Sequence, residues 1–218
     1  MPSASQPAGR RERNKQEKLE RITAAASALF ATHSINEVTT QQIADAADIG
    51  TGTLFLYAKT KGELLLLVQN TNYERALTKG VDAAERTSDA IEALMALVTP
   101  IVECNRVHAE NGRIYLREMM FGDPGEPHHA EALSIVQRTQ SAFEDIVLRL
   151  TTHNREQAAT HAQVVSALLF VSMASAPHDA PPTEILQQIR DQPLVTTAPP
   201  RRPPRSSASS ACGVCSNE

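Results

Sequence analysis

Apolar residues recur at helical spacing from near the start of the chain. After a polar, basic arm they lie three or four positions apart, and they are Leu19, Ile22, Ala26, Leu29 and Phe30. This spacing places them on one face of an amphipathic helix. The pattern therefore predicts a first helix over residues 12–33.

Two short helices joined by a tight turn are predicted next. Thr39 and Gln42 have the spacing of a capping box, in which the two side chains satisfy free backbone amides at a helix start. A second helix is therefore expected to begin near residue 40. The pattern stops at Asp48-Ile49-Gly50, and residues 51–57 can form barely two more turns.

The rest of the chain reads as helix after helix. The apolar residues keep the helical period over residues 61–86, 88–109, 111–121, 128–151, 154–176 and 183–190. Pro100 lies inside one of these segments, where the missing backbone donor predicts a kink. Loops rich in Pro and Gly separate the later helices, and no internal repeat is found. The predicted fold class is all-α.

Composition agrees with this fold class and limits the location of the protein. Only 9 glycines, 4% aromatic residues and no tryptophan argue against a β-rich fold. No apolar run reaches the ~18 residues of a membrane helix, and the N-terminus lacks the apolar segment of a secretory signal. Three cysteines are too few for a disulfide framework, so reduced thiols in the cytoplasm are expected.

Charge is distributed unevenly along the chain. Residues 1–61 hold 8 Lys and Arg against 6 Asp and Glu, residues 62–190 hold 10 against 17, and residues 191–218 hold 3 against 2. A basic front end beside an acidic body is typical of a module that meets a polyanion and a second module with another task.

Three segments follow from pattern and charge together. A helix-turn-helix unit is predicted at residues 10–60 and a longer helical body at residues 61–192. From residue 193 to residue 218 the chain is mostly Pro, Ser, Thr and Arg, which predicts a disordered tail. This tail contains Cys212 and Cys215, whose CxxC spacing is interpreted as inert.

The run from Thr39 to Leu64, TTQQIADAADIGTGTLFLYAKTKGEL, resembles the helix-turn-helix signature of the TetR/AcrR family of bacterial transcriptional regulators. The resemblance covers residues 18–66, and the later helices agree with the family in number and length. Two positions depart from the family pattern. Asp48 stands where glycine is usual, at a position expected to need a left-handed backbone, and Phe55 replaces the usual tyrosine.

The resemblance implies a set of DNA-contacting residues, which are Thr40, Thr51, Thr53, Phe55, Leu56, Tyr57 and Lys61. A helix that enters the ~12 Å major groove needs small or polar residues at its start, and Gly50 and Gly52 add close backbone approach. Thr40, Tyr57 and Lys61 are placed to reach phosphates, while Thr51 and Thr53 are placed to reach base edges. The basic arm, residues 10–15, is read equally as a solvated run or as a DNA contact.

The resemblance also implies an effector pocket in the helical body. Adaptable or aromatic side chains are the candidates for its lining, and they are Met95, Cys104, His108, Tyr115, Met119 and Phe143. The alternative is that they belong to an ordinary core. Cys104 and His108 have the i, i+4 spacing of two zinc ligands, but further ligands are not evident, so no metal is predicted. No catalytic motif is present, and neither an enzyme nor a cofactor is expected.

These observations predict a homodimeric repressor that a small, apolar effector releases from a double-stranded DNA operator. Helices 154–176 and 183–190 are the expected dimer surface, since the last two helices pair in this family. One alternative is a ligand-independent or activating regulator with the same DNA chemistry. The other is a helical small-molecule-binding protein with a degenerate helix-turn-helix.

Overall fold

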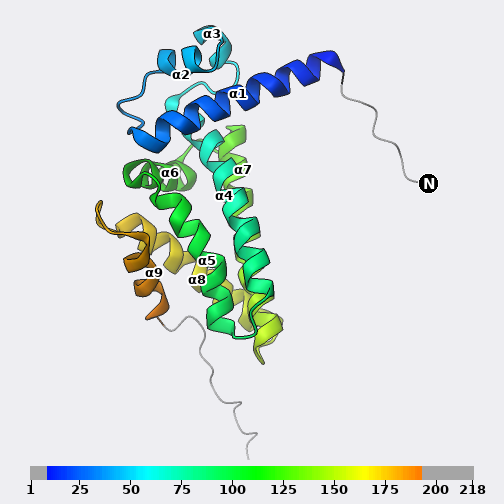
Figure 1. The fold of residues 1–218 in the computed structure, drawn as a ribbon. Helices are drawn as coiled ribbons and strands as arrows, with labels where there is room; N and C mark the ends of the chain where they lie inside the picture. The colour runs from blue at the N-terminus through cyan, green and yellow to red at the C-terminus, as the bar shows by residue number, and fades with distance from the viewer. Residues whose placement is uncertain (1–8, 193–218) are drawn as a thin grey trace, which may run out of the picture.

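The computed structural model describes residues 9–192, and this part of the chain is all-α, as predicted (Figure 1). Its helices are α1 (Arg10–Thr32), α2 (Thr40–Ala46), α3 (Thr51–Leu54), α4 (Lys61–Glu85), α5 (Ala90–Arg106), α6 (Ala109–Phe121), α7 (Pro127–Leu150), α8 (Arg155–Ser175) and α9 (Pro182–Arg190). The predicted tail from residue 193 on, with both of its cysteines, lies outside the described residues.

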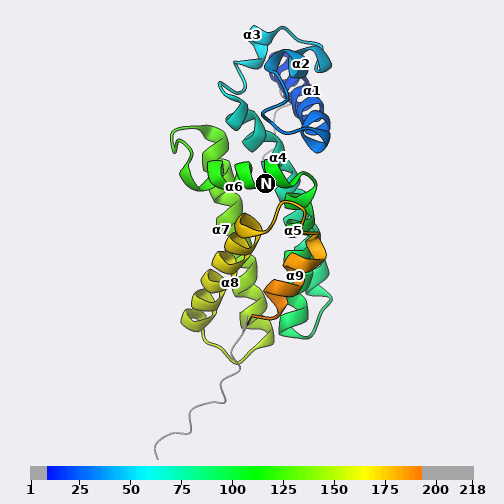
Figure 2. The ribbon, with the colours of Figure 1, turned by 90° about the vertical axis from the view of Figure 1, so that its left-hand side faces the viewer.

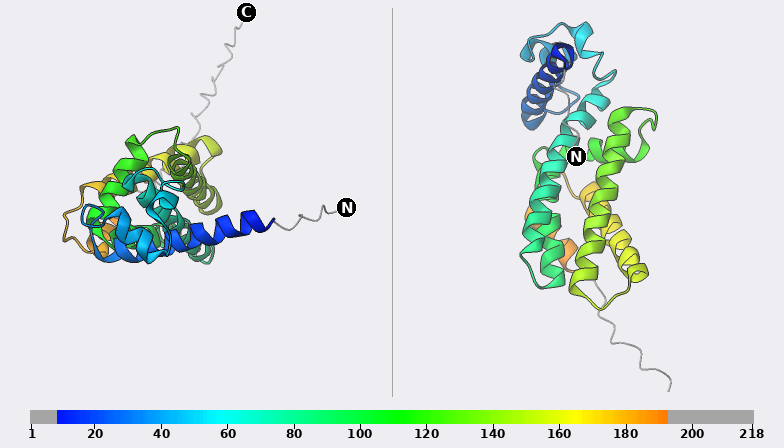
Figure 3. Two further views of the ribbon diagram at one scale, coloured as in Figure 1. Left: turned by 90° about the horizontal axis from the view of Figure 1, so that it is seen from above. Right: turned by 90° about the vertical axis from the view of Figure 1, so that its right-hand side faces the viewer.

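The helices form two groups along one long axis. Figures 1 and 2 show α1, α2 and α3 at one end, with α4 leaving this end and running down into the body. In the body α4 packs against α5 and α7, α8 packs against α7, and α9 packs against α5 (Figure 3). Helix α4 therefore belongs to both groups and connects them mechanically.

The small N-terminal group is held by one apolar core and by local caps. Its centre contains Ile22 of α1, Ile43 of α2 and Leu54 of α3, and all three side chains are fully buried. The capping box is confirmed, because the Gln42 amide donates to Thr39 Oγ1 at 3.2 Å and the Thr39 amide donates to Gln42 Oε1 at 2.8 Å. These features fix where α2 starts and how α3 lies on it.

The turn between α2 and α3 contains one residue in the left-handed backbone region. Asp48 has a φ of 52°, and it is the one non-glycine residue with positive φ in the described chain. The expectation drawn from the missing glycine is therefore confirmed. Arg21 of α1 reaches this turn and donates to the Asp48 carbonyl and carboxylate at 3.5 and 3.4 Å. Asp48 therefore forms this turn without a glycine.

The break between α5 and α6 falls a few residues earlier than predicted. Helix α5 ends at Arg106, and His108 caps α6 by accepting the Asn111 amide at its Nδ1. Gly112 allows the two helices to approach closely, since a Cβ at this position would lie 2.2 Å from the Asn105 carbonyl oxygen. Helix α5 continues through Pro100.

Helix α8 is apolar on most of its surface. It is the one helix within residues 9–192 that is long and apolar enough to cross a membrane by length and composition, although this test also selects core helices of soluble proteins. One face, which includes Val165 and Leu169, is buried in the body. Val164 and Val171 on another face are 55% and 57% exposed. This second apolar face has no cover within the described chain.

Candidate DNA-binding surface and ligand cavities

The end of the molecule formed by α3 exposes an unusual set of side chains. Leu54 is fully buried, but the next two residues point outward, with Phe55 45% and Leu56 83% exposed. Large apolar side chains left in water beside each other on a small unit mark an interaction surface. Both residues belong to the predicted DNA-contacting set.

Two glycines lie beside this surface at positions where the structure has room for a larger side chain. A Cβ added at Gly50 or at Gly52 would meet no heavy atom within 4 Å, and neither glycine has a positive φ. Neither backbone strain nor packing inside the chain therefore requires glycine here. Bare backbone at the first turn of α3 leaves open access for an external partner, which agrees with the predicted role of both residues.

The two threonines of α3 are half-buried, and one of them has a defined partner. Thr51 Oγ1 donates to Gln41 Oε1 at 2.8 Å, and Gln41 Nε2 donates to Asp45 at 2.7 Å. Gln41 is exposed on α2 next to the start of α3. It was not among the predicted site residues, because its contact with Thr51 depends on how α2 and α3 cross. Thr53 stays a predicted base contact.

The predicted phosphate contacts Thr40, Tyr57 and Lys61 lie around this surface. Thr40 opens α2, and the Tyr57 hydroxyl donates to the Lys15 carbonyl of α1 at 3.3 Å. Lys61 Nζ donates to the carbonyls of Ile35 and Val38 at 2.8 and 3.2 Å, which ties α4 to the loop before α2. An ammonium group has three protons. Lys61 therefore keeps one donor for a phosphate while holding the loop.

The basic arm is the first part of α1. Its residues, Arg10, Arg11, Arg13 and Lys15, are all exposed, and Figure 1 shows this end of α1 extending past the other helices of the group. Lys15 lies next to Tyr57, since its carbonyl accepts the tyrosine hydroxyl. A DNA contact by the arm stays a prediction.

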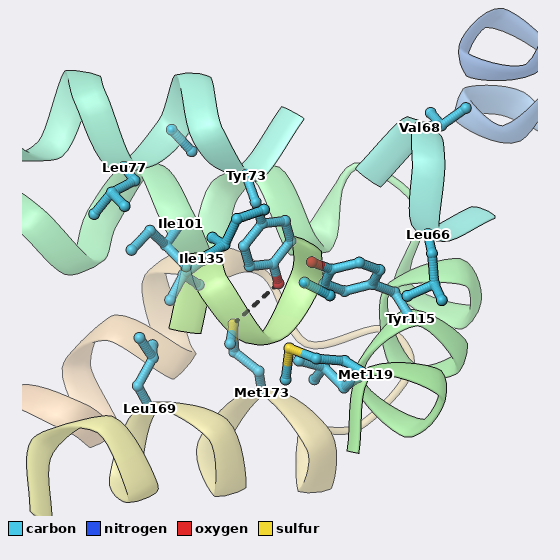
Figure 4. Close-up of a cluster of buried hydrophobic side chains, with 14 of the residues drawn as sticks. Leu66, Val68, Tyr73, Leu77, Ile101, Tyr115, Met119, Ile135, Leu169 and Met173 are labelled. Carbon is cyan, nitrogen blue, oxygen red and sulfur yellow. Dashed lines mark hydrogen bonds between the residues drawn. The ribbon is translucent and has the colours of Figure 1, made fainter. Parts of the chain in front are cut away.

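A cavity of about 310 Å³ lies in the body between α4, α5, α6, α7 and α8. Figure 4 shows several of the side chains that line it, among them Tyr73, Tyr115 and Met119. Its wall is mostly apolar and includes Tyr73, Ile101, Tyr115, Met119, Ile135 and Met173. No charged side chain among residues 9–192 lines it, and its polar groups include Gln140, Gln163 and Ser166. We call it the effector cavity.

Two of the six predicted lining residues, Tyr115 and Met119, line the effector cavity. Met95 and Phe143 are buried but do not line it, so for them the alternative of an ordinary core position fits the structure. Cys104 and His108 face a different cavity. Tyr73 was missed, because on α4 it looks like any core aromatic until α5 and α6 pack beside it.

The second cavity has a volume of about 280 Å³ and lies between α1, α4 and α5. We call it the junction cavity, because α1 belongs to the N-terminal group and α5 to the body. Cys104 and His108 line it. Burial raises the pKa of the Cys104 thiol to about 11, so the thiol stays protonated at neutral pH. No group of three potential metal-binding side chains occurs within the described residues.

A chain of hydrogen bonds leads from the effector cavity to the end of α3. The Tyr115 hydroxyl donates to Asn70 Oδ1 at 3.0 Å, and Asn70 Nδ2 donates to the His128 carbonyl at 2.8 Å. His128 Nε2 in turn lies 3.0 Å from the Tyr57 carbonyl. Burial raises the pKa of Tyr115, so its hydroxyl stays a donor. A cavity residue is thus connected to the segment that follows α3.

A second polar connection begins at Tyr73 and runs along α6. Asn105 Nδ2 donates to the Tyr73 hydroxyl at 2.8 Å and to the Gly112 carbonyl at 3.2 Å. The neighbouring Asn111 is 1% exposed and donates to the carbonyls of Phe30 and His33, both at 2.8 Å. Its Oδ1 also accepts the Ile35 amide at 2.8 Å. Asn111 therefore joins α6 to the end of α1.

Comparison with known proteins agrees with this architecture. Residues 22–68 match the model of bacterial regulatory proteins of the tetR family. No curated protein matches the chain.

Solved structures share the fold over most of their length. A TetR transcriptional regulator from Rhodococcus sp. RHA1 is 17% identical with a TM-score of 0.61, over 81% of this chain and 93% of that one. A tetR-family bacterial regulatory protein from Rhodococcus RHA1 is 23% identical with a TM-score of 0.57, over 81% and 95%. AibR, solved with isovaleryl coenzyme A and operator DNA, is 13% identical with a TM-score of 0.54, over 79% and 96%. Residues 22–68 thus resemble the helix-turn-helix unit of bacterial regulatory proteins of the tetR family, and the described chain shares the fold of these solved regulators.

Proposed function

We propose that this protein is a cytoplasmic, homodimeric repressor that binds double-stranded operator DNA and leaves it when an apolar effector enters the effector cavity. The observation that carries the proposal is the exposed surface of α3. Phe55 and Leu56 lie in water there beside Gly50 and Gly52, which are exposed and have no heavy atom of residues 9–192 within 4 Å of a Cβ position. A surface of this kind fits the major groove, where small residues admit the helix and apolar groups meet thymine methyls.

The proposal gives separate roles to the threonines of α3 and to the groups around it. Thr51 and Thr53, in the first turn of α3, are proposed to read base edges, with Gln41 orienting the Thr51 hydroxyl. Thr40 and Lys61 are proposed to hold phosphates on either side of the groove, and Tyr57 is proposed to join them by turning its hydroxyl proton from the Lys15 carbonyl to a phosphate. Phosphate contacts position the helix, while base contacts supply the choice of sequence. The intact left-handed turn at Asp48 supports a working helix-turn-helix over a degenerate one.

The homodimer is proposed to form through α8. Val164, Leu168 and Val171 are spaced by four and three residues and therefore lie on one stripe of this helix. Val164 and Val171 are more than half exposed, and Leu168 between them is half-buried with part of its side chain against the core. A single helix-turn-helix reads too few base pairs, so a pair of units about one DNA turn (~34 Å) apart is needed.

Effector binding is proposed to act through the two hydrogen-bond connections. An occupant of the effector cavity contacts Tyr73 and Tyr115, which begin the connections to α1 and to the segment after α3. A shift of Tyr73 moves the hydroxyl that Asn105 binds, and a shift of Tyr115 moves the hydroxyl that Asn70 binds. Either shift is proposed to change the position of the DNA-binding unit. AibR, a neighbour with this fold, is known with both a ligand and operator DNA. The effect is limited by the effector's differential affinity for the two conformations.

The decisive experiment measures DNA affinity on the intergenic fragment that flanks the protein's own gene. Thr53→Ala should cost about 1–3 kcal/mol on this fragment and much less on random DNA, because a lost base contact affects only the correct sequence. Thr78→Ala is the matched control, since Thr78 is an exposed threonine of α4 in the body. Equal losses on both DNAs would make Thr53 a phosphate contact or a structural residue. Absence of binding to the fragment by the unaltered protein would refute the proposal.

A further inference from the structure

The junction cavity is enclosed by both parts of the molecule. Helix α1 contributes Ser27, Phe30 and Ala31, and helix α4 contributes Val68, Gln69, Asn72 and Arg75. Cys104 comes from the end of α5, and Val107 and His108 come from the turn between α5 and α6. We propose that this cavity binds a small organic anion with an apolar body, at a site separate from the effector cavity. The binding itself does not depend on the proposed repressor function.

The charge of the lining selects an anion. Arg75 lines the cavity and forms no ion pair with any residue from 9 to 192, whereas its neighbour Glu74 is paired with Arg138. Asn72 and Ser27 add further hydrogen-bond donors, and neither Asp nor Glu lines the cavity. The body around it is acidic, with 17 Asp and Glu against 10 Lys and Arg over residues 62–190. Exposed Arg75, with no acidic side chain beside it in the lining, attracts a carboxylate or sulfonate locally, against the net negative charge of the body.

The floor of the cavity selects an apolar body for that anion. Phe30 and Val68 are buried side chains of its wall, and Val107 at its edge is 66% exposed. The Cys104 thiol is uncharged at neutral pH and behaves as a small apolar group. An inorganic ion would leave these groups in contact with water. An aromatic or branched anion would cover them while its charged group meets Arg75.

Because the cavity lies between the N-terminal group and the body, a bound molecule contacts both. Ser27, Phe30 and Ala31 belong to α1, while Arg75 belongs to the part of α4 inside the body. An occupant that touches both sides stabilises one angle between the N-terminal group and the body. In so far as the proposed repressor function holds, such an anion modulates DNA affinity independently of the apolar effector.

The test uses a pair of fluorescent probes with the same aromatic skeleton. 8-Anilino-1-naphthalenesulfonate carries a permanent negative charge, and N-phenyl-1-naphthylamine lacks the sulfonate. We expect Arg75→Gln to weaken binding of the sulfonate probe at least tenfold and to leave binding of the uncharged probe unchanged. Arg86→Gln is the matched control, because Arg86 is an exposed arginine that follows α4 and does not line the cavity. Arg86→Gln should leave the binding of both probes unchanged.

Two further measurements locate the probe. Ala31→Trp fills the cavity from an exposed position of α1 and should abolish sulfonate binding without unfolding the chain. The sulfonate probe should also slow alkylation of Cys104, followed on its own peptide by mass spectrometry. Sulfonate binding that survives both Arg75→Gln and Ala31→Trp, or that is lost in Met119→Trp instead, would overturn the proposal. No DNA is present in these assays, so their failure is distinct from a failure of the repressor model.

Discussion

Replacement of Asn111 tests how strongly α6 is joined to the DNA-binding unit. The side chain is almost fully buried and makes three hydrogen bonds of 2.8 Å, two to the end of α1 and one to the Ile35 amide. Each bond contributes about 1 kcal/mol net, and a buried group left without a partner costs about 1–3 kcal/mol. Asn111→Ala should therefore lower the free energy of unfolding by about 3–5 kcal/mol.

The measurement is a urea titration at fixed protein concentration, with Asn36→Ala as the control. Asn36 crosses the same joint by an exposed hydrogen bond of 3.2 Å to Glu110, so its loss should cost less than about 0.5 kcal/mol. Asn111→Asp should lower the free energy of unfolding at least as much as Asn111→Ala. The aspartate keeps the acceptor for the Ile35 amide, but its second oxygen faces the two carbonyls that the asparagine NH₂ group had bound. A loss below about 1 kcal/mol in Asn111→Ala would refute the view that this residue holds the joint.

Three further predictions concern the cavity, the turn and the DNA contact. Phe143→Trp should lower the thermal midpoint, since overpacking a filled core typically costs ~1–3 kcal/mol, whereas Met119→Trp should cost little and abolish the effector response. Equal drops in the thermal midpoint of the two variants would argue against the effector cavity. Asp48→Gly should raise the free energy of unfolding by about 0.5–1 kcal/mol by relieving the left-handed backbone, and a decrease would mean that the exposed pair with Arg21 outweighs that strain. Lys61→Ala should weaken all DNA alike and flatten the dependence of log K on log salt by roughly one, and an unchanged slope would place Lys61 away from DNA.

The helices and their caps could be predicted because they depend on residues close together in sequence. The capping box of Thr39 and Gln42 and the positive φ of Asp48 are determined within a few residues, and both were foreseen. The identity of the cavity residues was foreseen only in part. Met95 and Met119 have the same chemistry, yet only Met119 lines the effector cavity, because the side of α5 or α6 that faces the cavity depends on the packing of distant helices.

The residues that connect the two groups of helices could not be found from the sequence at all. Asn70 and Asn111 were not among the predicted site residues, because asparagine usually lies on the surface. Both are buried with their amides bonded to backbone groups 58 or more positions away in sequence, such as the His128 carbonyl for Asn70 and the Phe30 carbonyl for Asn111. A sequence reading by helical period has no access to such partners.

This hydrogen-bonding pattern has a mechanical consequence for the switch between conformations. The side-chain amide of Asn111 keeps its hydrogen-bond partners only while α6 lies beside the end of α1. Asn70 keeps its partners only while α7 lies beside α4. A small displacement of either helix leaves buried polar groups unpaired, whose cost rises steeply in a poorly solvated interior. Intermediate positions are therefore unfavourable, and the joint favours discrete arrangements. An effector that moves Tyr73 or Tyr115 should accordingly switch the DNA-binding unit between two positions, with the fraction of molecules in each position set by effector concentration.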